Sequence, residues 1–275
     1  MSIRLLNSSD IPAAMRLKEA AGWNQTEDDW RTLLAIAPDS CFCVECSGQV
    51  AATTTAVVYG SKLAWIGMVL TAPEFRKRGF AHMLLRHTLD YLREHEIEWA
   101  KLDATEMGAP VYSDFDFQFE CRVERWSRPA GAPPAAKNRC SDQAVEARAM
   151  AQRDAFGVSR EQLLERLIRE GGTSINESGF ALWRPGSFAH YFGPCVATSS
   201  GAAEQLLRNC LRANAGLPFV WDLATQNAAA VELAEAYGFQ RARTLSRMEC
   251  ALRPDVTPLR PDMNSIFALA GFEFG

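Results

Sequence analysis

The chain repeats one pattern of strand, turn and helix, and this repeat limits the folds it can adopt more than any other feature. In the first half, the apolar run 63–70 leads into the basic turn 76–81, and a helical pattern continues to about residue 96. In the second half, the strand-like run 189–197 leads into the turn 198–203, which is again followed by a helical pattern. Self-similarity of this kind indicates that one structural unit occurs twice.

The spacing within the two halves agrees position by position. Gly79 lies 33 positions before Tyr112, and Gly201 lies 33 positions before Ala234. Two further sets of positions align on the same register, namely Thr105 with Asn227 and Asp116-Phe117 with Gly238-Phe239. The second copy keeps the glycine of the turn but has neither of its arginines, so its turn carries no charge.

Length and composition allow two domains, and a Pro/Ala-rich segment marks the boundary between them. The chain has 275 residues, of which 48% are hydrophobic, enough for two buried cores. Residues 129–136 are rich in proline and alanine without an apolar period, which is typical of a semi-rigid linker. The sequence therefore predicts a first domain over 1–128, a linker over 129–140, a second domain over 141–252, and a C-terminal arm over 253–275 that packs on the domains.

The turn 76–81, Arg-Lys-Arg-Gly-Phe-Ala, joins a strand to a helix and has the properties of an anion-binding site. The first N–H groups of a helix have no intrahelical partner, and the helix dipole places partial positive charge there. Arg76 and Arg78 add full charges, and Gly79 lets the backbone approach a phosphate without a Cβ in the way. A basic turn that is only solvated has the same composition, so the wider context decides between the two interpretations.

The elements predicted for the first half follow the order β-α-α-β-β-β-α-β-α-β, a mixed sheet with helices on both faces. They include strands over 49–59 and 99–104, a first helix with Asp10 as its N-cap, and a second helix that begins with a capping box over 26–29. The motif Arg-x-x-Gly-x-Ala at residues 76–81 stands between the fourth strand and the third helix. Tyr112 and Phe117 follow it at the spacing Tyr-x-x-x-Gly-Phe. These features resemble the GNAT superfamily of acetyl-CoA-dependent N-acetyltransferases. One departure is Asp116, which occupies the position where that superfamily usually has glycine.

The resemblance covers nearly the whole chain and implies an α/β fold, with two GNAT domains in tandem. It implies that acetyl-CoA binds in the first half, with its pyrophosphate on the basic turn and its pantetheine arm along a strand that separates from its neighbour at a bulge. The expected cofactor-binding residues are Met68, Val69, Leu70, Arg76, Lys77, Arg78, Gly79, Phe80, Ala81 and Thr105. The second half resembles a degenerate copy, in which Ala234 replaces Tyr112, so one active site is expected.

Acetylation of an amine by a thioester needs a neutral amine, a stabilised oxyanion and a proton for the leaving thiolate. The resemblance implies that the backbone at 68–70 supplies an oxyanion donor. It also places the hydroxyl of Tyr112 beside the sulfur, where Tyr112 would act as the general acid. The alternative is that Tyr112 is an ordinary half-buried helix residue. The sequence does not identify the general base, and the candidate carboxylates are those of Asp28, Asp29, Glu45 and Glu106.

The resemblance implies that the loop between the first two predicted helices covers the acceptor side. Its candidate substrate-binding residues are Trp23, Asn24, Gln25, Asp28 and Trp30. Such aromatic and amide groups suit a small polar or amino-acid-like amine, whereas the structural alternative is a pair of tryptophans that only hold the helices together. Two other functions stay open. One is acetylation of a protein N-terminus or lysine, which favours an open cleft, and the other is a non-enzymatic acyl-CoA-binding regulatory module.

The charge balance and the cysteines argue against several other classes of protein. A net charge of −4 disfavours non-specific nucleic-acid binding, no apolar run has transmembrane length, and the N-terminus lacks a signal-peptide core. We therefore expect a cytoplasmic monomer or homodimer with a small-molecule amine substrate and no membrane or nucleic-acid partner. Cys41, Cys43 and Cys46 have no second Cys/His pair at ligand spacing, so we expect buried thiols and no metal site.

Overall fold

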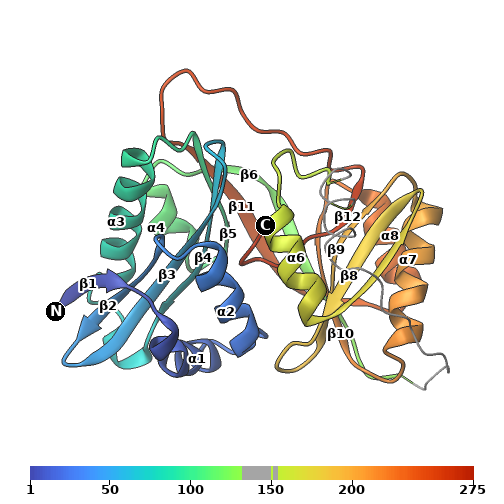
Figure 1. The fold of residues 1–275 in the computed structure, drawn as a ribbon, viewed down its shortest axis with the longest axis horizontal. Helices are drawn as coiled ribbons and strands as arrows, with labels where there is room; N and C mark the ends of the chain where they lie inside the picture. Colours follow the sequence, from blue (N-terminus) through green and yellow to red (C-terminus); the bar gives the residue numbers. More distant parts are fainter. Residues whose placement is uncertain (132–149, 151–153) are drawn as a thin grey trace. The chain divides into compact units, whose positions relative to one another are not determined.

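The computed structural model describes residues 1–131, 150 and 154–275, and the chain forms two compact units. Unit 1 consists of residues 1–119, 248–259 and 274, and unit 2 of residues 120–247, 260–273 and 275 (Figure 1). The units cut across the boundary expected at residue 128, because strands β6 (Gln118–Arg128) and β11 (Gln240–Ala251) each belong partly to one unit and partly to the other. The expected linker from residue 132 onward lies outside the described residues.

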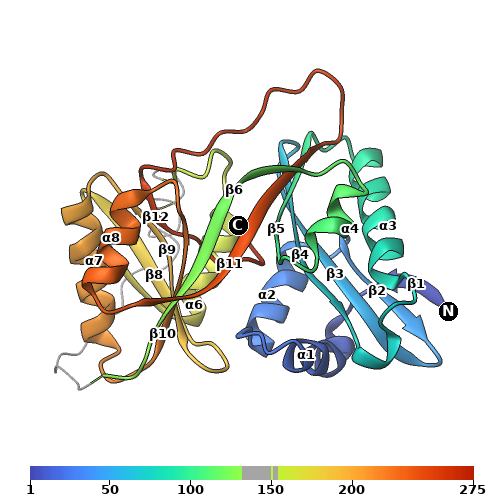
Figure 2. The same ribbon diagram turned by 180° about the vertical axis from the view of Figure 1, so that it is seen from behind.

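Unit 1 is a mixed sheet with helices on both faces. Its strands follow the order β1-β2-β3-β4-β5, and β11 lies next to β5. Strands β1 to β4 pair antiparallel, whereas β4 and β5 are parallel. Helices α3 (Phe80–Glu94) and α4 (Ala109–Ser113) lie on one face of the sheet, and α1 (Ile11–Ala20) and α2 (Glu27–Ile36) on the other (Figures 1 and 2). The strand bounds are β1 Ser2–Leu5, β2 Cys41–Cys46, β3 Gln49–Tyr59, β4 Leu63–Thr71 and β5 Trp99–Ala104.

The core of unit 1 follows from the periodicity of α3. Leu85, Leu89 and Leu92 recur on one helix face and pack with Ala56 of β3 and Ala100 of β5 in one buried cluster. Burial of each leucine contributes roughly 1.5–3 kcal/mol, and the alanines on the strands allow the helix to lie close to the sheet. The same cluster contains Met248, Cys250 and Leu252. The first core is therefore completed by the end of β11.

Two helix starts in unit 1 test the expected capping. Thr26 and Asp29 form the predicted capping box at the start of α2, with each side chain bonded to the other's backbone N–H. Asp10 precedes α1 as expected, but its carboxylate makes no capping bond to that helix. It accepts hydrogen bonds from the Arg4 guanidinium and from the N–H of Asn7 instead. Asp10 is therefore the N-cap residue of α1 by position, as predicted, but its side chain fixes the link from β1 and does not cap the helix.

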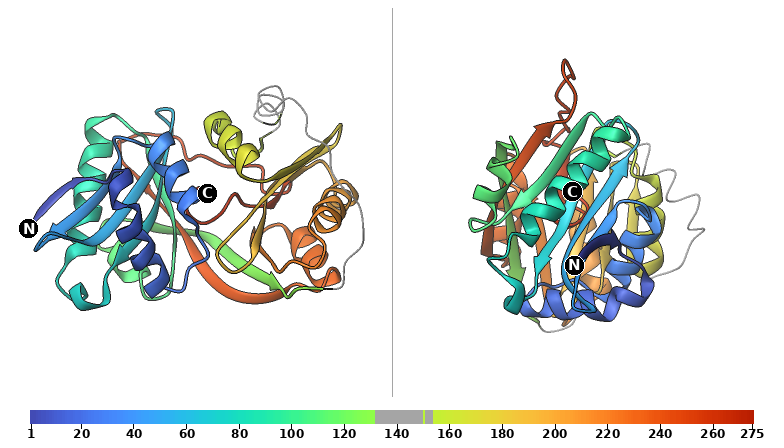
Figure 3. Two further views of the ribbon diagram at one scale, coloured as in Figure 1. Left: turned by 60° about the horizontal axis from the view of Figure 1, so that its bottom comes forward. Right: turned by 90° about the vertical axis from the view of Figure 1, so that its left-hand side faces the viewer.

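Unit 2 repeats this architecture, with strands in the order β11-β6-β10-β9-β8-β7. Helix α6 (Glu161–Glu170) lies on one face of the sheet, and α7 (Ser200–Ala213) and α8 (Ala228–Ala236) lie on the other (Figure 3). The expected C-terminal arm contributes strand β12 (Ile266–Ala268), which pairs with β9. The remaining strand bounds are β7 Gly172–Asn176, β8 Gly179–Arg184, β9 His190–Ala197 and β10 Phe219–Ala224. Among the helices of the described residues, none is both long and apolar enough to cross a bilayer.

The turn after α4 matches the turn after α8 in its backbone. Asp116 has φ +65°, and the aligned Gly238 has φ +76°, so both lie in the left-handed region. The N–H of Phe117 bonds the carbonyl of Tyr112 at 3.3 Å, and the N–H of Phe239 bonds that of Ala234 at 2.9 Å. The aspartate at the usual glycine position therefore keeps the turn, but it adopts a conformation that favours glycine.

Replacement of this aspartate by glycine is expected to stabilise unit 1. Asp116→Gly removes the steric cost of a Cβ at positive φ, and the greater entropy of glycine in the unfolded chain offsets part of the gain. We expect the free energy of unfolding to rise by about 0.5–1 kcal/mol. Urea denaturation followed by circular dichroism measures the change. The reverse control, Gly238→Asp, should destabilise the protein. A lower denaturation midpoint for Asp116→Gly would contradict this account.

Candidate active site

Strands β4 and β5 separate in unit 1 at the place where the resemblance predicted an opening. Their parallel pairing ends at Trp65 and Lys101, although β4 continues to Thr71 and β5 to Ala104. Beyond Trp65, the backbone N–H and C=O groups on the edge of β4 that faces β5 are therefore not paired with β5 and can pair with a ligand. Backbone amides on such an edge can pair with an extended ligand that carries its own amide groups.

A β-bulge on β4 lies beside this opening. Thr53 is opposite Leu70 and Thr55 is opposite Gly67, so β4 has one residue more than β3 between these pairs. Met68, within the bulge, has φ +49°, and the hydroxyl of Thr53 donates to its carbonyl at 2.8 Å. The extra residue turns the local backbone away from the regular ladder. The predicted bulge is confirmed, and Thr53, which sequence reasoning did not single out, holds it.

The basic turn that follows β4 has the geometry of an anion site. Arg76, Lys77, Arg78 and Gly79 are exposed, and Gly79 has φ +78° at the N-cap of α3, without a side chain that caps the helix. The first backbone bond of the helix is donated by the N–H of Met83 to the carbonyl of Gly79, at 2.9 Å. The N–H groups ahead of Met83 therefore remain available at the positive end of the helix dipole.

Tyr112 lies in α4, half-buried against the core of unit 1. Its ring centroid is 6.0 Å from that of Phe117, in an edge-to-face arrangement. Burial raises the pKa of the Tyr112 phenol above its ordinary value, because the charged phenolate would lose solvation. Within the described part of the chain, no residue hydrogen-bonds to the hydroxyl. Tyr112 thus keeps its proton at neutral pH and has the hydroxyl available for a ligand.

Thr105 lies in the turn before α4. Its hydroxyl accepts a hydrogen bond from the N–H of Gly108 at 3.1 Å. A Cβ on Gly108 would come within 3.2 Å of the Tyr112 ring, so glycine at this position leaves room for the ring. Thr105 was predicted to bind the cofactor. In the structure its hydrogen bond to Gly108 fixes the turn that leads into α4, and so the position of Tyr112.

The predicted acceptor loop is more buried than an open binding surface. Asn24 and Gln25 are 5% and 3% exposed, and Trp30 is fully buried. Trp23 is half-buried, and Asp28 is exposed with its carboxylate 2.7 Å from the Arg31 guanidinium. Full burial of Trp30 favours the structural alternative for that residue. Of the five candidates, Trp23 and Asp28 reach the surface.

The candidate bases are held in other interactions or lie in the open. Asp29 is fully buried in the capping box with Thr26, and Glu45 pairs with Arg4 at 2.9 Å. Glu106 is exposed. A carboxylate that sequence reasoning missed is that of Glu249, which lies 2.9 Å from the buried ammonium of Lys101. No linear spacing could have found this pair, because Glu249 follows Lys101 by more than half the chain and reaches unit 1 through β11.

The turn of unit 2 differs from that of unit 1 in its backbone. The side chain of Ser199 caps α7 and accepts from the N–H of Ala202 at 3.3 Å. Helix α7 begins at Ser200, so Gly201 lies inside its first turn without the positive φ of Gly79. Gly201 aligns with Gly79 in sequence, but the two glycines do not share a backbone conformation. A hydroxyl of the chain itself already satisfies one of the N–H groups that an anion would need.

The first two cysteines are buried thiols, as predicted. Burial raises the pKa of Cys41 to about 12 and that of Cys43 to about 11. Both therefore stay protonated near neutral pH, and a protonated thiol is a poor nucleophile and a poor metal ligand. Cys46 is half-buried, and Cys140 lies outside the described residues. The thiols of Cys41 and Cys43 contribute to packing in β2.

Comparison with known proteins agrees with the two-unit architecture. One solved structure, a putative acetyltransferase from Pyrococcus horikoshii, has a TM-score of 0.83 at 20% identity and covers 100% of this chain and 95% of that one. A GCN5-related N-acetyltransferase from Sphaerobacter thermophilus has a TM-score of 0.65 at 14% identity, over 93% and 96%. A tandem GNAT protein from the clavulanic acid biosynthesis pathway has a TM-score of 0.61 at 14% identity, over 93% and 99%. At these identities the likeness concerns the fold.

Family models match both halves of the sequence. The model described as "Acetyltransferase (GNAT) family" matches residues 12–117, and the one described as "Acetyltransferase (GNAT) domain" matches residues 150–268. A search of curated proteins finds no match. The two models together span most of the chain, and each falls on one copy of the repeat. The chain belongs to the GNAT acetyltransferases and carries two such domains in tandem.

Proposed function

We propose that the protein transfers an acetyl group from acetyl-CoA to the primary amine of a small polar or amino-acid-like acceptor, at a single site in unit 1. The observation that carries the proposal is the sequence of features along β4 and α3. The strand separates from β5 after Trp65, bulges at Met68, and leads into an exposed turn with two arginines and a left-handed glycine. This arrangement offers an edge for pantetheine amides and a cradle for phosphates within one stretch of chain.

In this mechanism the residues of unit 1 bind the donor in three places. The pyrophosphate lies on the N–H groups at 79–81, near Arg76 and Arg78, and the pantetheine arm pairs with the backbone of 68–70. An N–H group of that backbone points at the thioester oxygen, and such an oxyanion donor contributes about 3–4 kcal/mol. No metal takes part in the proposed mechanism. We assign this chemistry to the cytoplasm.

The proposed reaction balances without a further reactant. The lone pair of the neutral amine attacks the thioester carbonyl carbon, and the tetrahedral intermediate collapses as the C–S bond breaks. The departing thiolate takes the proton of Tyr112, and the acetylated nitrogen loses its extra proton to a base or to water. Solvent then returns a proton to Tyr112. The raised pKa of this phenol supports the assignment, because the general acid must be protonated when the thiolate leaves.

The acceptor side is assigned to the segment that carries Trp23, Asn24, Gln25 and Asp28. Trp23 and Asp28 reach the surface of this segment, and an indole ring with a carboxylate suits a small polar amine, whereas a folded protein would need an open cleft. The experiment that follows also distinguishes two alternative functions: acetylation of a protein N-terminus or lysine, and acyl-CoA binding without transfer.

A panel of amines with acetyl-CoA, followed by release of free thiol, tests the proposal. The panel includes amino acids, polyamines, and peptides with either a free N-terminus or an internal lysine. Thiol release that depends on a small amine supports the proposed acceptor. Release with the peptides alone would favour the protein acetyltransferase. Tight binding of acetyl-CoA without release for any amine would favour the regulatory module.

The hydroxyl of Thr53 is expected to keep the bulge in the shape that catalysis needs. Thr53→Val is nearly isosteric and removes the donor to the Met68 carbonyl, which lies at 2.8 Å. Loss of one such bond, worth about 1.4 kcal/mol, should lower kcat/KM roughly tenfold. Thr53→Ser keeps the hydroxyl and should retain most activity.

A matched control lies next to it in β3. Thr54 is also buried, and its hydroxyl has no hydrogen-bond partner among the described residues. Thr54→Val should therefore leave kcat/KM unchanged. Equal effects of the two valine substitutions would show that the hydroxyl of Thr53 has no special role in the bulge.

A further inference from the structure

Unit 2 contains the same kind of opening between parallel strands as unit 1. The pairing of β9 with β10 ends at Phe192 and Trp221, although both strands continue. Ala181 of β8 is opposite Cys195 and Trp183 is opposite Phe192, so β9 has one extra residue at this place. The same shift occurs between β3 and β4 in unit 1. The two units therefore share both the bulge and the separation of strands.

In unit 2 the opening is filled by residues 264–270, which we name the C-terminal strap. Its strand β12 pairs antiparallel with β9, with Ile266 opposite Val196 and Ala268 opposite Cys195. The N–H of Leu269 donates to the carbonyl of Asp222 in β10 at 2.8 Å. The strap thus hydrogen-bonds to both strands that border the opening, where a ligand with amide groups would otherwise lie.

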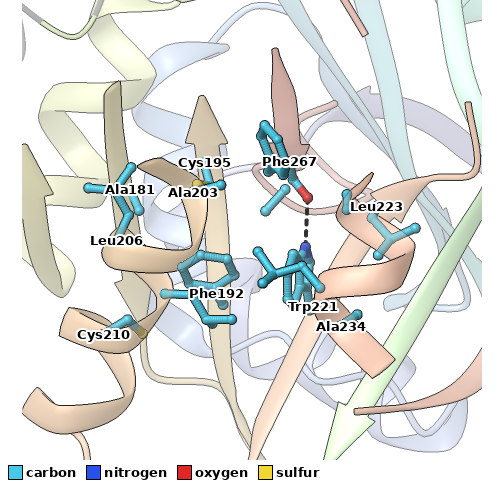
Figure 4. Close-up of a cluster of buried hydrophobic side chains, with 14 of the residues drawn as sticks. Ala181, Phe192, Cys195, Ala203, Leu206, Cys210, Trp221, Leu223, Ala234 and Phe267 are labelled. Atoms are coloured by element: carbon cyan, nitrogen blue, oxygen red, sulfur yellow. Dashed lines mark hydrogen bonds between the residues drawn. The ribbon is translucent and has the colours of Figure 1, made fainter. Parts of the chain in front are cut away.

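Side chains of unit 2 donate to the carbonyls of the strap. The indole N–H of Trp221 donates to the carbonyl of Phe267 at 2.8 Å (Figure 4). The amide of Asn227 donates to the carbonyls of Asn264 and Ile266, at 3.1 and 3.0 Å. The guanidinium of Arg184 donates to the carbonyl of Ala270 at 2.9 Å. Strand pairing and three side chains therefore satisfy the backbone of the strap along its length.

Residues 266–270 of the strap are as buried as the core around them. Residues 266–270 are each 2% exposed or less. Phe267 and Ala268 belong to the same buried cluster as Phe192 and Trp221, on the α7 and α8 side of the sheet (Figure 4). A Cβ built on Gly193, in the bulge of β9, would come within 2.0 Å of the carbonyl oxygen of Leu269. The strap therefore lies so close to the bulge that only glycine fits there.

We propose that the strap is a permanent occupant of the place that the pantetheine arm takes in unit 1. Pantetheine is an extended chain with two amides, and a peptide segment offers the same hydrogen-bonding groups to the strand edges. The inference rests on the proposed function for the meaning of the opening in unit 1. Unit 2 also has an uncharged turn, and Ser199 caps its helix. Each chain therefore binds one acyl-CoA, and the second opening is closed by the chain itself.

Hydrogen exchange on the full chain, combined with calorimetric titration of acetyl-CoA, tests the proposal. Residues 265–269 should exchange as slowly as β9, with or without acetyl-CoA. Acetyl-CoA should bind once per chain and slow exchange at residues 66–71. Fast exchange at 265–269 in the free protein would overturn the proposal. Binding of two acetyl-CoA molecules, or acceleration of exchange at the strap by acetyl-CoA, would do the same.

The variant Asn227→Asp loosens the strap while it keeps the helix start. The retained side-chain oxygen can still accept from the N–H of Ala230, which it meets at 3.1 Å, but both donors to the strap are lost. Exchange at 265–269 should rise about tenfold or more, with the affinity for acetyl-CoA unchanged. The matched control is Asn209→Asp, which makes the same chemical change in α7, where the Asn209 amide donates to Ser174 at 3.1 Å. Equal exchange at the strap in both variants would contradict the assigned role of Asn227.

The two proposals can fail separately in this design. If no acetyl-CoA binds and residues 265–269 exchange slowly, the proposed function fails, and the strap remains the occupant of the opening in unit 2. If acetyl-CoA binds twice and the strap exchanges fast, the proposed donor is supported and the strap proposal is overturned.

Discussion

Tyr112→Phe should lower kcat for thiol release by about 10²- to 10⁴-fold and leave the affinity for acetyl-CoA nearly unchanged. The substitution removes only the hydroxyl. Phenylalanine keeps the ring that packs 6.0 Å from Phe117, so α4 and the core of unit 1 should keep their shape. A loss confined to kcat is the signature of an interaction made in the transition state. Stopped-flow detection of free thiol at saturating acetyl-CoA and amine gives the number.

Tyr91→Phe serves as the matched control for this variant. Tyr91 lies in α3 of the same unit, with its ring stacked 4.0 Å from that of His95. Its replacement removes the same atom at a distance from the proposed sulfur position, so activity should stay at the wild-type level. Release of thiol by Tyr112→Phe at the wild-type rate with every amine would show that Tyr112 is not the general acid.

The pH dependence of the wild-type rate gives a second, independent readout. Burial raises the pKa of Tyr112, so the phenol stays protonated through the ordinary tyrosine pKa of about 10. Loss of the acid form can then lower the rate only above that pH. Below it, kcat/KM should rise with pH as an alkylamine of pKa about 10.4 loses its proton. A descending limb near pH 8 would assign the proton to a different group.

Local structure was predictable because strands, turns and helices follow from short patterns. The run that became β3 and the residues that became β5 were predicted with the bounds that the structure gives them, Gln49–Tyr59 and Trp99–Ala104. The capping box at Thr26 and the bulge near Met68 also followed, the first from its sequence and the second from the family resemblance. Each of these features depends on residues that are close together in the chain.

Features that depend on distant partners were not predictable. The pattern of β11 identifies a strand but not its neighbours, so nothing in the sequence assigns its last residues to the core of unit 1. Gly201 aligned with Gly79 in sequence, yet the hydroxyl of Ser199 starts α7 ahead of it. Trp30 was a candidate substrate-binding residue, and its full burial is decided by tertiary packing. In each case the outcome is set by a contact rather than by composition.

The duplicated fold offers a sharp test of the phosphate cradle, because one chain contains a charged and an uncharged version of the turn. Arg76→Ala with Arg78→Ala removes two exposed guanidinium groups beside the N-terminus of α3. Charge-assisted contacts to phosphate at an exposed site contribute roughly 1.5 kcal/mol each, so the Kd for acetyl-CoA should rise about 100-fold. The remaining affinity should depend less on salt, since fewer charges are left to screen.

Two controls separate the cradle from general effects of charge and of the turn. Arg208→Ala with Arg212→Ala makes the same change in net charge on the exposed side of α7 and should leave the Kd unchanged. Thr198→Ala with Ser200→Ala alters the aligned turn of unit 2 and should also have no effect. Acetyl-pantetheine, which lacks the phosphates, should bind the double arginine variant as well as it binds the wild type. An unchanged Kd for acetyl-CoA in the variant without Arg76 and Arg78 would mean that the donor does not lie on this turn. The proposed mechanism, which places the pyrophosphate there, would then be wrong.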